Sequence, residues 1–182
     1  MARGKAGQLL RLRVAPNLIP SLGTPEAQVL WMGCSDSGFA ETQTLDLLPE
    51  EIIEHRNPAN VFSNGDMGAS STLEYALRIL QVKHIIVAGH YGCRLVNTAA
   101  KNSPTRNCDV SGFHEHHGEE PERNGGSKEH NRRLVELHVW SQAQALLRID
   151  RVRGAQQARG LKVHAFVYDS DANECIELMT AE

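Results

Sequence analysis

The sequence predicts one α/β domain, residues 1–182, with a mostly parallel central sheet and flanking helices. Short apolar runs rich in β-branched residues alternate with helical patterns, which is typical of parallel strands joined by crossover helices. The chain of 182 residues has the length of one domain and contains no internal repeat. Its 41% hydrophobic and 23% charged residues are typical of a globular protein with a substantial core.

The first elements are a buried strand over residues 28–33 and a short helix over residues 40–48. The helix is expected to end there because Pro49 disfavours helical backbone in the residue before it. Residues 51–55 form the next predicted strand, and a turn-forming run rich in Asn and Pro follows them.

The most regular helical pattern follows Ser71, whose spacing to Glu74 is that of a capping box. Apolar residues then recur at helical period, which predicts a helix over residues 71–80. Residues 83–88 contain a β-branched run that is typical of a central parallel strand. A strand, a helix and a strand in this order indicate a right-handed parallel crossover.

The second half of the chain is predicted to contain one long helix and a final pair of strands. The helix is expected over residues 131–147, and the strands over residues 161–168 and 174–179. The expected buried positions of the helix are Leu134, Leu137, Ala145 and Leu146.

Two segments lack such patterns. Residues 1–27 are basic and free of acids before Glu26, and we expect an N-terminal arm or helix that packs on this subunit or on a partner. A mitochondrial presequence is the alternative. Residues 101–130 are rich in Ser, Pro, Asn, Gly, His and Glu, and we expect a long surface excursion. We interpret its histidines as solvated rather than as a second metal site: His114, His116, His117 and His130.

Composition narrows the classes of function. The net charge of −3 does not favour binding to nucleic acid, and no apolar run approaches the roughly 20 residues that span a bilayer. Four cysteines spread over 182 residues do not form a disulfide framework. Reduced thiols favour an intracellular setting, and we expect the cytoplasm.

Three soft-metal ligands follow the predicted strands. Cys34 follows the strand over residues 28–33, while His90 and Cys93 follow the strand over residues 83–88. The carboxyl ends of parallel strands meet at one edge of a sheet, so these side chains are expected to converge there. Two thiolates and an imidazole form a Cys₂His set that binds Zn²⁺ and leaves a fourth position for water.

Asp36 lies two residues beyond the first ligand and has two candidate roles. It accepts a hydrogen bond from the zinc-bound water, or it occupies the fourth position itself. In the first case zinc lowers the pKa of the water to about 7, and the hydroxide attacks a small electrophilic carbon such as that of CO₂. A turn-capping role after the strand is the structural alternative.

These segments resemble the β-class carbonic anhydrases over roughly residues 28–100 and 131–179. The motifs that carry the resemblance are Cys34-Ser35-Asp36-Ser37, Arg56-Asn57, Leu73-Glu74-Tyr75-Ala76, Gly89-His90-Tyr91-Gly92-Cys93, Leu134-Val135-Glu136-Leu137 with Gln142, and residues 163–169.

The resemblance implies that Cys34, His90 and Cys93 hold zinc, and that the enzyme interconverts CO₂ and bicarbonate. It also implies a homodimer or homotetramer with a small-molecule substrate. Relatives of the same fold hydrolyse carbonyl sulfide or carbon disulfide, which is an alternative activity for this chain.

Two positions depart from the family pattern. Gly38 replaces the arginine of the Cys-x-Asp-x-Arg motif, and Arg94-Leu95 replaces two glycines after Cys93. Loss of the arginine removes a charge-assisted partner of Asp36, which would then close the zinc site and leave a catalytically silent pseudoenzyme. Alternatively, Arg94 reaches back to Asp36 and replaces the missing arginine. A solvated Arg94 at the start of a helix is the third possibility.

Overall fold

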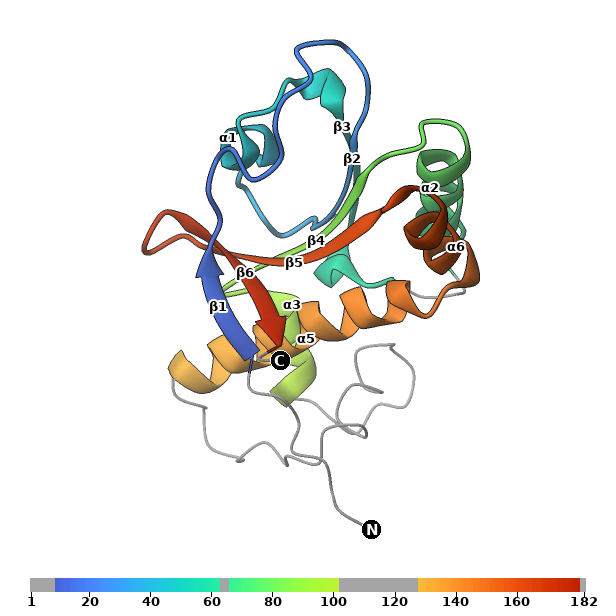
Figure 1. Ribbon diagram of the computed structural model, residues 1–182. Coiled ribbons are helices and arrows are strands. Elements are labelled where there is room, and N and C mark those ends of the chain that lie inside the picture. Colours follow the sequence, from blue (N-terminus) through green and yellow to red (C-terminus); the bar gives the residue numbers. More distant parts are fainter. Residues whose placement is uncertain (1–8, 63–65, 102–127, 181–182) are drawn as a thin grey trace.

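The computed structural model describes residues 9–62, 66–101 and 128–180. Within these ranges the chain forms a six-stranded sheet in the order β1-β6-β5-β4-β2-β3 (Figure 1). Four neighbouring strands are parallel, and they are β2 (Val29–Cys34), β3 (Ile52–Asn57), β4 (His84–His90) and β5 (Lys162–Asp169). The predicted α/β fold with a mostly parallel sheet is confirmed.

The antiparallel end of the sheet is formed by β6 (Glu174–Thr180) and β1 (Leu9–Arg13). The predicted final pair of strands is therefore confirmed as the β5–β6 hairpin. The expectation of a helix in the N-terminal arm is wrong for residues 9–13, because their backbone pairs with β6. Side chains alternate between the two faces of a strand, and Arg11 points to the helical layer, where it contacts Glu136.

Helices cover one face of the sheet (Figure 1). They are α2 (Met67–Arg78), α3 (Arg94–Lys101), α5 (Lys128–Leu147) and α6 (Asp150–Arg159). The larger apolar cluster lies between these helices and the strands, and α5 contributes Leu134, Val135, Val139, Ala143 and Leu146 to it. Of the expected buried positions, Leu137 and Ala145 are only partly buried.

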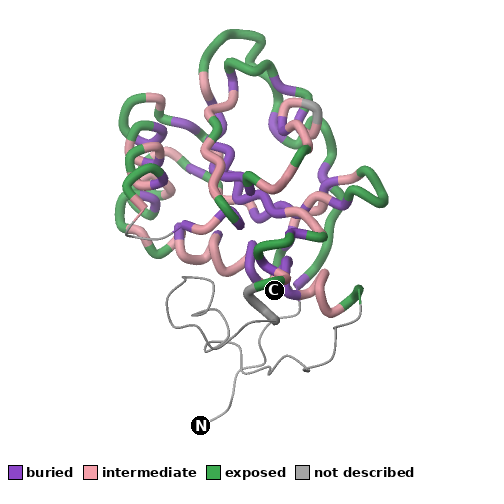
Figure 2. Tube along the Cα trace, turned by 180° about the vertical axis from the view of Figure 1, so that it is seen from behind, coloured by how far each residue is buried: buried purple, intermediate pink, exposed green. Residues whose placement is uncertain are grey.

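The opposite face carries a second, smaller apolar cluster. Trp31, Ile86 and Phe166 project from three strands and pack against Val14, Ile19, Leu45 and Leu47. The last four residues belong to the chain around α1 (Glu41–Leu45) and to the segment after β1. Burial is concentrated along the central strands, as Figure 2 shows. Two short 3₁₀ turns, Pro49–Glu51 and Pro58–Asn60, flank β3.

The start of α2 differs from the prediction. The helix begins at Met67, and the Asp66 carboxylate caps it by accepting hydrogen bonds from the N–H groups of Gly68 (2.9 Å) and Ala69 (3.1 Å). The predicted capping box at Ser71 is therefore wrong, since Ser71 lies inside the helix. An aspartate at the N-cap satisfies the first unpaired N–H groups, which Ser71 cannot reach one turn later.

Two further elements modify the predicted order. Helix α6 was not predicted, because its sequence is largely polar and contains Gly154. Helix α5 begins at Lys128, so the last residues of the predicted 101–130 excursion are helical. Residues 102–127 lie outside the described residues, as do residues 1–8 of the predicted arm. Among the helices that the structure describes, none is long and apolar enough to cross a bilayer.

Candidate metal centre

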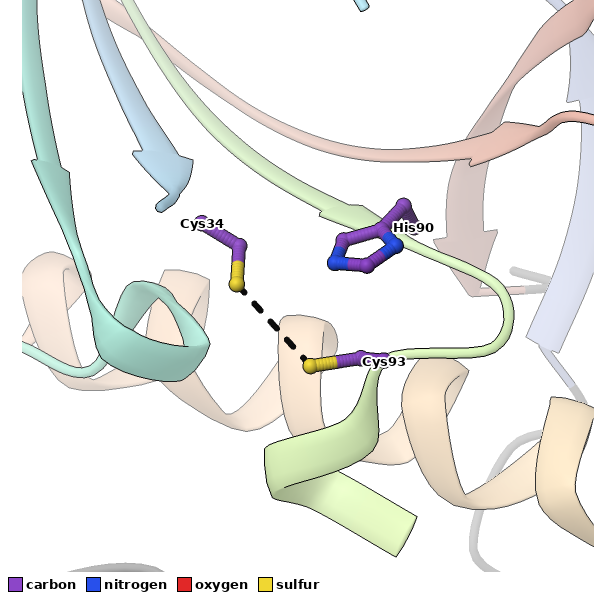
Figure 3. Close-up of side chains that lie close together, drawn as sticks. All are labelled: Cys34, His90 and Cys93. Atoms are coloured by element: carbon purple, nitrogen blue, oxygen red, sulfur yellow. Dashed lines mark hydrogen bonds between the residues drawn. The ribbon is translucent and has the colours of Figure 1, made fainter. Parts of the chain in front are cut away.

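The predicted zinc ligands converge at the carboxyl edge of the sheet. Cys34 is the last residue of β2 and His90 the last of β4, two parallel strands that pair directly. Cys93 follows one turn later, immediately before α3. Figure 3 shows the three side chains pointing toward one another. Their ligand atoms all lie within 4.8 Å, and the two sulfur atoms are 3.9 Å apart.

This geometry fits a tetrahedral zinc ion. Two sulfurs at a Zn–S distance of about 2.3 Å are separated by about 3.8 Å in a tetrahedron. Both cysteines are buried, with 1% and 2% of their surface exposed. Within the described part of the chain, the buried Nε2 atom of His90 has no hydrogen-bond partner, which is unusual for a buried polar atom. A metal ion would satisfy it.

The loop that carries two of the ligands requires glycine at two positions. Gly92 has a φ of +77°, a left-handed conformation that favours glycine, and it turns the chain from His90 to Cys93. A Cβ atom at Gly89 would lie 2.3 Å from Cγ2 of Val139, so glycine allows β4 to pack closely on α5. The N–H group of Tyr91 donates to the Tyr168 carbonyl (2.9 Å), which continues the β4–β5 pairing into the loop.

The contact between the two sulfur atoms shifts the pKa values of the two thiols in opposite directions. The hydrogen bond with Cys93 lowers the pKa of Cys34 to about 4, and the same contact raises the pKa of Cys93. The Asp36 N–H also donates to the Cys34 sulfur (3.3 Å). Zinc coordination requires both sulfurs as thiolates, so binding of zinc would displace the remaining proton.

Asp36 is bound by Arg94 rather than pointing freely into the cluster. The Arg94 guanidinium donates to both carboxylate oxygens, with Nε 3.0 Å from Oδ1, and Nη2 also contacts Oδ1. The backbone N–H of Arg94, the first residue of α3, donates to Oδ2 (3.1 Å). These contacts lower the pKa of Asp36 to about 2. Among the described residues, Asp36 is not part of the metal-binding cluster.

A cavity of about 230 Å³ opens beside the cluster. Its lining residues are Ser37, Gly38, Phe39, His90, Tyr91, Tyr168 and Ser170. Phe39 stacks on Tyr168 with ring centroids 4.2 Å apart and forms an aromatic wall. A Cβ atom on Gly38 would meet no atom within 4 Å, so the position is open. A small molecule therefore has access to the side chain of His90.

Arg56 supports the first ligand strand. Its guanidinium donates to the carbonyl oxygens of Cys34 and Phe39, both at 3.3 Å, and it also pairs with Glu41 and Glu54. It therefore fixes the chain on either side of Asp36 without joining the metal cluster.

A buried ionic network behind the ligand loop was missed by sequence reasoning. The Tyr91 hydroxyl donates to Oε1 of Glu136 (2.7 Å), whose side chain is fully buried. Arg11 donates to both carboxylate oxygens of Glu136, at 2.7 and 2.9 Å. Arg132 stacks on the Tyr91 ring at 4.2 Å and pairs with Asp169. A glutamate within the apolar face of a predicted helix was the signal that the sequence offered.

The other cysteines and the histidines of the 101–130 segment are not part of the cluster where the structure describes them. Cys175 is buried in β6 and lies outside the three-residue set. Cys108, His114, His116 and His117 lie outside the described residues, and His130 lies in the first turn of α5.

Comparison with known proteins agrees with this architecture. The carbonic anhydrase family model matches residues 29–175. A carbonic anhydrase of Emericella nidulans is 34% identical over 151 residues, and one of Candida albicans is 30% identical over 153 residues. The matches cover 78% and 77% of this chain, but only 65% and 52% of those relatives. The chain therefore spans between half and two thirds of their length.

Solved structures share the fold. The β-carbonic anhydrase CafD of Aspergillus fumigatus superimposes with a TM-score of 0.74 and 30% identity, covering 94% of this chain and 99% of that one. A tetrameric β-carbonic anhydrase of Sordaria macrospora gives a TM-score of 0.73 and 30% identity, covering 85% of this chain and 82% of that one. The matched family model, the fold and the ligand cluster agree. This chain belongs to the β-carbonic anhydrase family.

Proposed function

We propose that this protein is a zinc enzyme that catalyses the reversible hydration of CO₂ to bicarbonate. The observation that carries the proposal is the Cys34–His90–Cys93 set, with both cysteines buried, at the carboxyl edge of a β-carbonic anhydrase fold. When bound there, zinc supplies a Lewis acid that lowers the pKa of water to about 7. The protein supplies the ligands, an aromatic pocket wall for an apolar gas and a carboxylate that orients water.

Asp36 is the orienting carboxylate in this proposal. Arg94 keeps it ionised and holds both of its oxygens, so the fourth position of a bound zinc ion would be left to water. Three N–H groups of Arg94 donate to Asp36, and a carboxylate has about four acceptor positions, so Asp36 can still accept one hydrogen bond from water. The contact with Arg94 thus argues against the silent pseudoenzyme in which Asp36 is the fourth ligand.

Hydrolysis of carbonyl sulfide or carbon disulfide is the second candidate. Gly38, Phe39 and Tyr168 line both the cavity beside His90 and a larger neighbouring cavity of about 780 Å³. The missing side chain at Gly38 therefore leaves more room than the family motif would, and this favours a bulkier electrophile.

The assembly that we propose is a homodimer or a homotetramer. The Sordaria macrospora relatives are described as tetrameric, and homo-oligomers with closed symmetry are the commonest assemblies. Sedimentation equilibrium of the purified protein distinguishes the two. For the compartment, free thiols at Cys34, Cys93 and Cys175 support a reducing environment such as the cytoplasm.

Stopped-flow CO₂ hydration by the zinc-loaded protein tests the proposed activity. The control pair is Cys34→Ser, which removes a ligand, and Cys175→Ser, which changes a buried cysteine outside the cluster. We expect hydration by the wild type and by Cys175→Ser, with loss of both zinc and activity in Cys34→Ser. A wild type that binds one zinc ion but hydrates no CO₂ contradicts the proposal. Carbonyl sulfide and carbon disulfide would then be tested on the same samples.

A further inference from the structure

Tyr91 lies in the ligand loop, residues 90–93, and contacts the first ligand of this loop through its backbone. Nδ1 of His90 lies 3.3 Å from the Tyr91 carbonyl oxygen, and it donates because a carbonyl only accepts. A neutral imidazole protonated at Nδ1 has its free lone pair on Nε2. In the described part of the chain, Nε2 of His90 has no partner, and Figure 3 shows a ring nitrogen of His90 on the side of the two cysteines. The Tyr91 carbonyl therefore favours the tautomer whose free nitrogen can bind a metal.

Tyr91 is itself held at its backbone and at the tip of its side chain. Its N–H group donates to the carbonyl oxygen of Tyr168 in β5 (2.9 Å), and its hydroxyl donates to Oε1 of Glu136 in α5 (2.7 Å). Between these two ends, the guanidinium of Arg132 lies 4.2 Å from the centre of the Tyr91 ring. Contacts with both the sheet and α5 thus fix the position of Tyr91 in the ligand loop.

Glu136 is a rigid acceptor for the Tyr91 hydroxyl. Its side chain is fully buried, and Arg11 from β1 donates to both carboxylate oxygens, at 2.7 and 2.9 Å. A bidentate, charge-assisted pair fixes the orientation of a carboxylate as well as compensating its charge. The oxygen that receives the hydroxyl is therefore placed by β1 and α5, two elements outside the metal cluster.

We propose that Glu136 is a positioning residue for the ligand loop and acts through the Tyr91 hydroxyl. A loop that carries two metal ligands loses conformational freedom when the metal binds, and a loop that is already held in place loses less. With Tyr91 fixed, His90 and Cys93 are held near their metal-binding positions, and His90 keeps its proton on Nδ1. This inference rests on the metal site proposed above, and it gives β1 and α5 a role in metal binding.

The test compares variants of the full-length chain in which single groups are removed. Tyr91→Phe deletes the hydroxyl and keeps the ring that packs on Arg132. Tyr75→Phe is the matched control, because it deletes the same group from a tyrosine of α2 that is 48% exposed and lies outside this network. Leu146→Ala controls for stability, since it creates a cavity in the core beside α5. Glu136→Met, alone and combined with Tyr91→Phe, tests whether the two residues act as one unit.

Three quantities are measured on each variant: zinc affinity by competition with a chromophoric chelator, the His90 tautomer of the metal-free protein by two-bond ¹H–¹⁵N NMR correlation, and urea unfolding of the metal-free protein. We expect Tyr91→Phe to bind zinc about 10 times more weakly, the lower end of the range for residues that support metal ligands, because the hydroxyl acts through the Tyr91 backbone. Its metal-free form should show a mixture of His90 tautomers instead of the Nδ1–H form alone. Tyr75→Phe should match the wild type in all three quantities, and Leu146→Ala should lose only stability.

Wild-type zinc affinity in Tyr91→Phe overturns the inference, as does an equal loss of affinity in Leu146→Ala. Glu136→Met should also weaken zinc binding, and adding Tyr91→Phe to it should weaken binding no further. A further loss of about 10-fold in the double variant overturns the inference too, because the two residues would then act independently. If Glu136→Met fails to fold, the Tyr91→Phe single variant decides.

A wild-type chain that binds no zinc would instead refute the metal site itself. The His90 tautomer of the metal-free protein would still report on the ligand loop in that case. The two failures are therefore distinguishable.

Discussion

Arg94 binds Asp36 through both its guanidinium and its backbone N–H. The two residues are 58 positions apart and come from the loops that carry Cys34 and Cys93. The side chain of Arg94 is 85% exposed, while that of Asp36 is 11% exposed. The Arg94 guanidinium thus neutralises the charge of the Asp36 carboxylate. The backbone N–H of the same residue, at the N-terminus of α3, also donates to that carboxylate. In this chain, Gly38 occupies the position at which the family motif has an arginine.

Removing Arg94 is expected to close the metal site. In Arg94→Gly the carboxylate of Asp36 loses its guanidinium partner and becomes free to act as a fourth zinc ligand. We expect CO₂ hydration to fall at least about 10-fold while zinc stays bound, because a carboxylate in the fourth position would exclude the water that zinc activates. Stopped-flow hydration and X-ray absorption of the zinc site measure both effects.

The double variant Gly38→Arg, Arg94→Gly tests whether an arginine at the family position restores CO₂ hydration. Space beside Gly38 is open, so the new side chain has room to reach Asp36 from the family position. Restored hydration supports the interpretation that Arg94 replaces the motif arginine. Unchanged hydration in Arg94→Gly alone would contradict that interpretation.

Zinc is expected to stabilise the fold through the same three ligands. A ligand that binds only the native state, at 100 times its Kd, adds about 2.7 kcal/mol to the free energy of unfolding. We expect Tm to rise with added zinc in the wild type and in Cys175→Ser. Cys93→Ser should lose this increment, and scanning calorimetry with and without zinc provides the measurement. An equal rise in Cys93→Ser would mean that zinc binds elsewhere.

Arg11 should be important for stability because it pairs with the buried carboxylate of Glu136, behind the ligand loop. Arg11→Met leaves Glu136, which is fully buried, without its bidentate partner. Because Arg11 itself is 43% exposed and Arg133 lies 3.6 Å from the same carboxylate, we expect a loss of about 2 kcal/mol, below the range for a fully buried pair.

Arg13→Met is the control for this prediction. It changes an arginine of the same strand that pairs with Glu174 at 3.4 Å and is 76% exposed, so its expected cost is under about 1 kcal/mol. Urea unfolding of both variants gives the difference. Equal costs would show that Glu136 does not depend on Arg11.

His84 should make the protein less stable in mild acid. Burial lowers its pKa from 6.5 to about 4, so between these values the unfolded chain binds more protons than the native one. Stability is therefore lost as the pH falls from about 6.5 toward about 4. Since the ring is only partly buried, we expect this loss to be about 1 kcal/mol.

The His84→Gln variant isolates this contribution. Its free energy of unfolding should fall less between about pH 7 and pH 5 than that of the wild type. His164, which lies 3.0 Å from Nδ1 of His84, is kept in both proteins, so the difference reports on His84. Parallel curves for the two proteins would contradict the assignment.

Local patterns were sufficient for the elements with strong periodicity. The β-branched run before Ala88 and the alternation of strands and helices predicted the parallel sheet that β2, β3, β4 and β5 form. They failed where local signals competed or were absent. Asp66 caps α2 in place of Ser71, and the polar helix α6 has a weak apolar pattern. For the strand Leu9–Arg13, the partner is β6, about 170 residues later, which no local window contains.

The sequence by itself determined the three ligand positions of the proposed zinc site. Cys34, His90 and Cys93 follow apolar strands, and parallel strands bring their carboxyl ends to one edge, so convergence could be expected without coordinates. Which contacts surround those ligands was decided only by the tertiary structure. The choice among a free, a zinc-bound or an Arg94-bound Asp36 depends on how two loops approach in space. The same holds for the contact between His138 and the Ala59 carbonyl oxygen, because side-chain hydrogen bonds across 79 residues follow from packing rather than from local sequence.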